Sequence, residues 1–76
     1  MRSIYCRFEK KENYRYYELR LHPDLFGWCV TKVWGRKNSS LGQIRHVACQ
    51  NYVDGLRLLN DLKAQRLHRG YQLTTP

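Results

Sequence analysis

The residues best suited to binding chemistry lie near the middle of the 76-residue chain, where Trp34, Gly35 and Arg36 follow one another. Tryptophan presents a flat π-face, and arginine presents a planar cationic fork that suits phosphate. Glycine lets another backbone approach closely. These three residues, here called the Trp34 corner, have two interpretations. In the first, they form a site that recognises a ring and a phosphate. In the second, the tryptophan fills the core and the arginine is an ordinary surface residue.

Further basic side chains flank this corner. Lys32, Lys37 and Arg45 are placed in the sequence to neutralise backbone phosphates, and such contacts give affinity without sequence specificity. The whole chain is basic, because 14 Lys and Arg stand against 6 Asp and Glu, for a formal net charge of +8. This balance favours a nucleic acid, an anionic lipid or an acidic protein as the partner.

The sequence gives little support for catalysis. A nucleophilic Cys or Ser needs a base and an orienting group beside it, whereas His22, His46 and His68 are scattered over separate predicted elements. A chain of this length also has little scaffold for enclosing a substrate. We therefore predict a protein that is not an enzyme and that needs no cofactor.

The cysteines point to a reducing compartment. Cys6, Cys29 and Cys49 are an odd number without a Cys-x-x-Cys pair, which argues against a disulfide framework. Zinc is conceivable from these three and His46 if neighbouring strands align them, but structural zinc sites usually take ligands in close-spaced pairs. We predict packed, reduced thiols and no metal. No signal peptide and no run of about 18 apolar residues is present, so we expect a cytoplasmic protein without a membrane partner.

Alternating polarity predicts a sheet for the first two thirds of the chain. A first strand has Ile4, Cys6 and Phe8 on one face, and a second, over residues 14–22, has Tyr17, Leu19 and Leu21 on one face. Pro23 and Asp24 are expected to end the second strand, since proline cannot donate to a ladder. In the third strand, residues 28–34, both faces are partly apolar, so the inward face stays open. Residues 37–42 predict a loop, and residues 43–50 predict a fourth strand.

The hydrophobic period changes to that of a helix after Asn51, a plausible N-cap, with Asp54 in the first turn. The helix is expected to run to about Arg69, with an apolar stripe formed by Tyr52, Leu56, Leu59 and the stem of Lys63, flanked by Leu62 and Leu67. Gly70 is the expected left-handed residue after it, and Tyr71 is expected to pack back on the last turn. Residues 72–76 read as a short tail.

Strands followed by one helix predict a single α+β domain over residues 1–76, with its core at about 3–71. We expect a curved antiparallel sheet of about four strands, a half-barrel, wrapped around one C-terminal helix. In this order the chain resembles the WGR domain from about Phe8 to Tyr71, and the resemblance implies the same arrangement. Its marks are Tyr16-Tyr17-Glu18-Leu19, Leu25-Phe26-Gly27-Trp28, Val33-Trp34-Gly35-Arg36, Gly42-Gln43 and Arg69-Gly70-Tyr71.

The resemblance also implies a function. WGR modules are best known from the poly(ADP-ribose) polymerases, where they lie upstream of the catalytic domain and contact a DNA strand end near a 5′ phosphate. By resemblance, Trp34 would pack on the terminal nucleotide, Gly35 would let the backbone come close, Arg36 would reach phosphate or a neighbouring domain, and Tyr71 would lie near the same surface. No catalytic domain is expected in these 76 residues, so ADP-ribosyl transfer is not carried over.

The expected partner is therefore DNA, at 5′-phosphorylated ends or nicks. One departure from the family pattern is Asn38, which stands where many members have glycine; asparagine tolerates the left-handed conformation. The first alternative is a protein–protein interaction module that uses the same corner and has no nucleic-acid role, and the second is a general RNA or single-strand binder.

Overall fold

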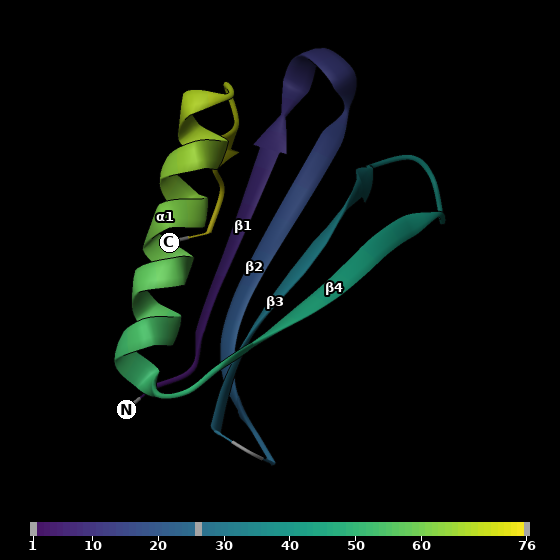
Figure 1. The fold of residues 1–76 in the computed structure, drawn as a ribbon. Coiled ribbons are helices and arrows are strands. Elements are labelled where there is room, and N and C mark those ends of the chain that lie inside the picture. The colour runs from purple at the N-terminus through teal and green to yellow at the C-terminus, as the bar shows by residue number, and fades with distance from the viewer. Residues whose placement is uncertain (1, 26, 76) are drawn as a thin grey trace.

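Five strands and one long helix follow one another along the chain in the computed structural model, which describes residues 2–25 and 27–75 (Figure 1). Their bounds are β1 Ile4–Lys10, β2 Arg15–Asp24, β3 Gly27–Arg36, β4 Gly42–Cys49, α1 Tyr52–His68 and β5 Gln72–Leu73, with a 3₁₀ turn, η1, at Lys11–Asn13. Phe26, expected to lead into the third strand, and Met1 and Pro76, the two ends of the predicted domain, lie outside the described residues.

The strands form one open antiparallel sheet in the order β4-β3-β2-β1-β5, and the predicted α+β class is confirmed. The second strand ends at Asp24, as predicted from Pro23 and Asp24, but its pairing runs past the predicted range of 14–22, since Asp24 still pairs with Gly27 of β3. Proline lacks only the donor, so it is tolerated where a strand runs into its turn. The short connection from Asp24 to Gly27 fixes the register of the whole β2–β3 ladder.

The helix covers one face of this sheet (Figure 1). The face of β3 that carries Trp28, Val30, Lys32 and Trp34 turns toward it, which answers a question that the sequence left open, since Val30 and its neighbours Leu21 and Leu59 are buried in one cluster. Cys29 and Thr31, on the opposite face, are buried as well. β3 is therefore buried on both of its faces around Val30.

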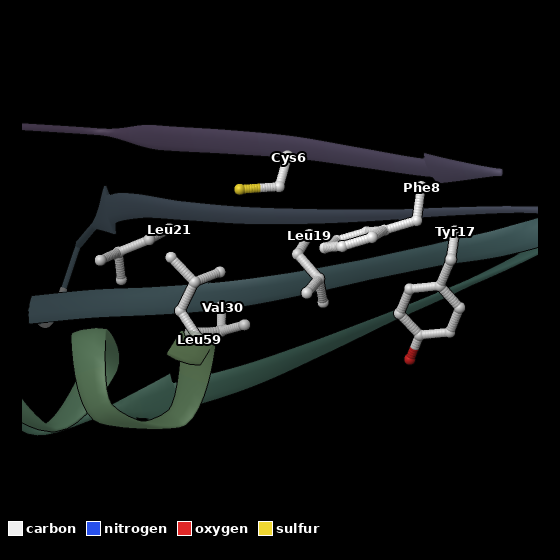
Figure 2. Packing of buried hydrophobic residues seen from close by; sticks show 7 residues of the cluster. All are labelled: Cys6, Phe8, Tyr17, Leu19, Leu21, Val30 and Leu59. Carbon is white, nitrogen blue, oxygen red and sulfur yellow. The ribbon is translucent and has the colours of Figure 1, made fainter. Parts of the chain in front are cut away.

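The core lies between the inward faces of β1 to β3 and the helix. Figure 2 shows its seven buried side chains, with Leu59 of α1 reaching toward the sheet: Cys6, Phe8, Tyr17, Leu19, Leu21, Val30 and Leu59. The alternation predicted for the first two strands is confirmed by these residues. Burying a large apolar side chain contributes about 1.5–3 kcal/mol, so each large member of this small cluster matters for stability.

The ends of α1 follow their sequence signals. The side chain of Asn51 accepts a hydrogen bond of 2.9 Å from the backbone N–H of Asp54, as an N-cap does. Gly70 has φ of +89°, and the N–H of Tyr71 donates to the carbonyl of Arg66. Leu67, predicted to flank the apolar stripe, is 52% exposed.

The predicted tail is in part a fifth strand. Gln72 and Leu73 pair with Glu9 and Phe8 of β1, and the backbone N–H of Thr74 donates to the carbonyl of Arg7. A strand of two residues has no readable period, so the sequence did not reveal it. In the part of the chain that is described, no helix is both long and apolar enough to cross a membrane.

Candidate nucleic-acid interface

Trp34 lies at the edge of the core, where it packs against the buried cluster. In the ladder it stands between Tyr17 of β2 and Gln43 of β4. Its ring stacks on that of Tyr17 with centroids 5.8 Å apart and an interplanar angle of 15°. The residue stays half-buried. Trp34 is thus anchored to the core on one side and accessible on another.

A hollow of about 360 Å³ opens beside Trp34. The strand ends and the β3–β4 connection line it, including Arg15, Trp34, Arg36, Ser39, Leu41 and Gln43. Arg15 and Arg36 are directly opposite each other in the β2–β3 ladder, and both are exposed. No carboxylate of the described residues lines this hollow. An aromatic wall beside two unneutralised guanidinium groups suits a ring that carries a phosphate.

A second pair of basic residues lies on the same face. Lys32 is directly opposite Arg45 in the β3–β4 ladder, two positions from Trp34 along β3. The β3–β4 hairpin diverges from α1 toward its tip (Figure 1), and β4 is exposed from Gly42 to His46. Within residues 2–25 and 27–75, none of Arg15, Lys32, Arg36 and Arg45 forms an ion pair with a carboxylate.

Gly35 makes room for a protein side chain. It pairs with Gly42, and a Cβ at these positions would lie 3.2 Å and 2.8 Å from the hydroxyl oxygen of Tyr16. Tyr16 therefore crosses the far side of the sheet directly behind the Trp34 corner. Because neither glycine has a side chain, Tyr16 can lie close to the backbone at this point. Neither glycine has a positive φ.

Lys37 is directed away from this basic face. Its ammonium group donates to the carboxylate of Glu9 at 2.8 Å, and its backbone N–H donates to the carbonyl of Tyr14. Side-chain hydrogen bonds from Lys37, which has the larger effect, and from Arg7 hold the pKa of the Glu9 carboxyl group below its usual range. Among the residues that the structure describes, Lys37 is thus the sequence-predicted site residue whose charge is paired with a carboxylate.

Tyr71 joins the site through the core rather than through the hollow. Its ring meets the ring of Tyr17 edge-on, with centroids 6.2 Å apart. The guanidinium of Arg66 lies 4.3 Å from the centroid of Tyr17 and 5.4 Å from that of Tyr71. A continuous row of Trp34, Tyr17, Arg66 and Tyr71 therefore connects the corner to the end of α1. Burial raises the pKa of the Tyr17 phenol, and Arg66 opposes that effect.

The sequence-predicted site included neither Arg15 nor Arg66. The signal for Arg15 is the ladder register, because the short turn after Asp24 places it opposite Arg36. The signal for Arg66 is its spacing, because it precedes Arg69 by three residues and Tyr71 by five. This spacing places its guanidinium group against the Tyr71 ring.

These features agree with one family of known proteins. A family model for the WGR domain matches residues 2–76, essentially the whole chain. No curated protein and no solved structure matches the chain. The chain therefore belongs to the WGR domain family, whose members are small modules of the nucleic-acid-binding type.

Proposed function

We propose that this protein binds DNA through its backbone and strand ends, with the Trp34 corner as the site for the terminal nucleotide. The observation that carries the proposal is the pair Arg15 and Arg36, directly opposite each other at the hollow beside Trp34. Like charges facing across a ladder are destabilising, so such a pair is expected where an anion compensates for it.

The flat wall of the hollow accounts for the nucleotide part of the ligand. One side of Trp34 is held by Tyr17, which fixes the orientation of the indole ring without closing the hollow. A base or sugar that packs against such a ring gains about 1–3 kcal/mol. A phosphate on the same nucleotide would lie within reach of the two guanidinium groups, and bidentate arginine contacts are the strong form of phosphate recognition.

Lys32 and Arg45 extend the same basic face along the β3–β4 hairpin. In this proposal they contact phosphates further along the strand and give affinity without sequence preference. If about four phosphates are neutralised, the slope of log K against log salt concentration is about −3 to −4. Lys37 contributes less, because its charge is already compensated by Glu9.

A second candidate function is a protein-interaction module that uses the same corner. The observation that favours it is Leu41, which is 82% exposed at the rim of the hollow. An exposed leucine beside arginines also fits a peptide with an apolar and an acidic side chain. In that case neither a DNA end nor its phosphate is needed.

Fluorescence anisotropy with labelled duplexes tests the proposal. Blunt and nicked duplexes with and without the 5′ phosphate are compared for wild type, Trp34→Ala, Arg15→Ala and Arg36→Ala. We expect the 5′ phosphate to raise affinity about tenfold, as one lost charge-assisted contact would predict, and each substitution to remove that preference. Arg57→Ala is the matched control, because Arg57 is an exposed helix arginine that faces Asp54 at 4.0 Å.

Circular dichroism of each variant separates loss of the site from loss of the fold. Salt-sensitive binding that ignores both the 5′ phosphate and the substitutions would reduce the function to general polyanion attraction. No binding at low salt would exclude DNA and favour the protein-partner function.

A further inference from the structure

The sheet face opposite α1 carries a cluster of metal-binding side chains from three neighbouring strands. His22 comes from β2, Cys29 from β3 and His46 from β4, and their donor atoms all lie within 4.8 Å of one another. The ladder register brings them together, because His22 pairs with Cys29 while His46 pairs with the nearby Thr31. The Trp34 corner does not include any of them.

One hydroxyl lies among the three donors. The Oγ1 atom of Thr31 is 2.7 Å from Nε2 of His22, 2.8 Å from Nδ1 of His46 and 3.8 Å from the sulfur of Cys29. A hydroxyl has one proton, so it donates to one imidazole and accepts from the other. Three strands thus direct two nitrogens and one sulfur at a single point.

The tautomer of His22 suits metal binding. Its Nδ1 atom lies 3.2 Å from the carbonyl oxygen of Pro23, which can only accept, so Nδ1 carries the proton. The Nε2 atom therefore presents its lone pair to the cluster. A metal-binding histidine commonly donates its other N–H to a carbonyl or carboxylate in this way, which fixes both ring orientation and tautomer.

We propose that His22, Cys29 and His46 bind a zinc ion through Nε2, the thiolate sulfur and Nδ1. Two imidazole nitrogens and one thiolate form a donor set that suits borderline-soft zinc and does not suit calcium or magnesium. Binding releases the thiol proton of Cys29 to solvent. It also requires a tautomer change in His46: without metal its Nδ1 donates to the Thr31 hydroxyl, which itself donates to Nε2 of His22, whereas with metal the ring proton resides on Nε2.

The fourth position is left for water or a small external ligand. The cluster borders a pocket of about 400 Å³, whose lining includes His22, Thr31, His46 and Glu18. Glu18 forms an ion pair with Arg7, so its carboxylate is already engaged. Catalytic zinc sites have three protein ligands and one open position, whereas structural zinc sites have four protein ligands.

The three donor atoms must move slightly closer together to bind zinc. Zinc–nitrogen bonds of about 2.0–2.1 Å and zinc–sulfur bonds of about 2.3 Å bring donors closer together than 4.8 Å. His46 is exposed on the edge strand β4, so its ring can rotate without repacking the core. Cys29 is buried with 5% of its surface exposed, which keeps the sulfur at the inner side of the cluster.

Titration with Co²⁺ of the full chain, reduced and without a histidine tag, tests the proposal. We expect one ion per chain, a thiolate-to-cobalt charge-transfer band in the near ultraviolet, and displacement of cobalt by Zn²⁺. Cys29→Ser should remove the band, and His22→Ala and His46→Ala should each weaken binding by at least about tenfold. Cys49→Ser and His68→Ala, which alter a cysteine and a histidine outside the cluster, should leave the band and the affinity unchanged.

Several results would overturn the proposal. Absence of the charge-transfer band in wild type would do so, as would a band that persists in Cys29→Ser and disappears in Cys49→Ser. His46→Ala guards against loss of the fold, because His46 is exposed; unchanged cobalt affinity in a folded His46→Ala variant would contradict the ligand set. A zinc-induced rise in Tm that wild type shows and folded His46→Ala lacks would support it.

Discussion

The ring of Tyr17 stacks on the ring of Trp34, its direct partner in the β2–β3 ladder, with 5.8 Å between centroids. Tyr17 belongs to the buried core, whereas Trp34 is half-buried and borders the hollow. The Trp34 corner therefore rests directly on the hydrophobic core. Any change that weakens the core at this end of the sheet also changes the orientation of the indole ring.

Replacing Tyr17 with leucine should lower the free energy of unfolding by about 1–3 kcal/mol. The substitution keeps an apolar side chain but removes the stack on Trp34 and the contact with the Arg66 guanidinium, which contribute about 0.5–1.5 and about 0.5–2 kcal/mol. Urea denaturation followed by circular dichroism measures the change. Tyr5→Leu is the control, because Tyr5 lies under Arg20 but is 40% exposed, and its loss should cost less than about 1 kcal/mol. Equal losses would show that the stack contributes nothing.

Local sequence signals were sufficient for most elements of the fold. The alternation around Leu19 and Leu21, the cap at Asn51 and the glycine at position 70 each depend on neighbouring residues, so they were predictable. The inward face of β3 was not, because Cys29 and Thr31 are buried on the side away from the helix. Burial there comes from cross-strand contacts, which a single strand does not encode.

The site was predictable in its residue types but not in its grouping. Trp34 and Arg36 were chosen from their chemistry, whereas Arg15 and the His22–Cys29–His46 cluster depend on which residues stand opposite each other. Ladder register converts distant sequence positions into neighbours, and a histidine seven residues before a cysteine has meaning only when the turn between them is known. Lys37 was chosen from sequence proximity, yet its side chain reaches Glu9.

Gly55→Ala should destabilise the protein, although alanine is the better helix former. A Cβ at position 55 would lie 2.7 Å from Cδ1 of Leu21, which is fully buried, so the leucine side chain would have to shift within the core. Helix propensity favours alanine by about 1 kcal/mol, whereas overpacking costs about 1–3 kcal/mol. We therefore expect a net loss of about 1 kcal/mol in urea denaturation.

The same substitution should become neutral or stabilising in a Leu21→Val background, because valine lacks the Cδ1 atom that the new Cβ would meet. A double-mutant cycle isolates this coupling. If Gly55→Ala has the same effect in both backgrounds, the contact with Leu21 is not the reason for glycine at this position.

Glu9→Gln should make stability less dependent on pH under acidic conditions. The pKa of Glu9 is lowered by hydrogen bonds from Lys37 first and Arg7 second. A carboxyl group whose pKa is lower in the folded state stabilises the fold above its unfolded pKa of about 4.5, and this contribution is lost as pH falls through the folded value. Urea midpoints at neutral pH and below about pH 4 should therefore differ more for wild type than for Glu9→Gln. Lys37→Gln removes the larger partner, so a wild-type pH dependence in that variant would contradict the assignment.

Arg45→Gln should raise stability while it weakens DNA binding, if the proposed function holds. Arg45 stands directly opposite Lys32, and facing like charges cost about 0.2–1 kcal/mol, so removing one of them should raise the free energy of unfolding by that amount at low salt. The same change removes one phosphate contact and should make the slope of log K against log salt concentration less steep by about one unit. Arg15→Gln should behave in the same way, because Arg15 stands opposite Arg36.

Arg57→Gln separates this prediction from a general effect of net charge. It lowers the net charge by the same amount as Arg45→Gln but alters a helix arginine that faces Asp54. We therefore expect smaller changes in the stability at low salt and in the salt slope than for Arg45→Gln. Urea denaturation and anisotropy titrations at several salt concentrations give both quantities for each variant. A gain in stability without a change in slope would mean that the facing charges repel each other but do not contact DNA. A change in slope shared by Arg57→Gln would mean that net charge alone drives binding.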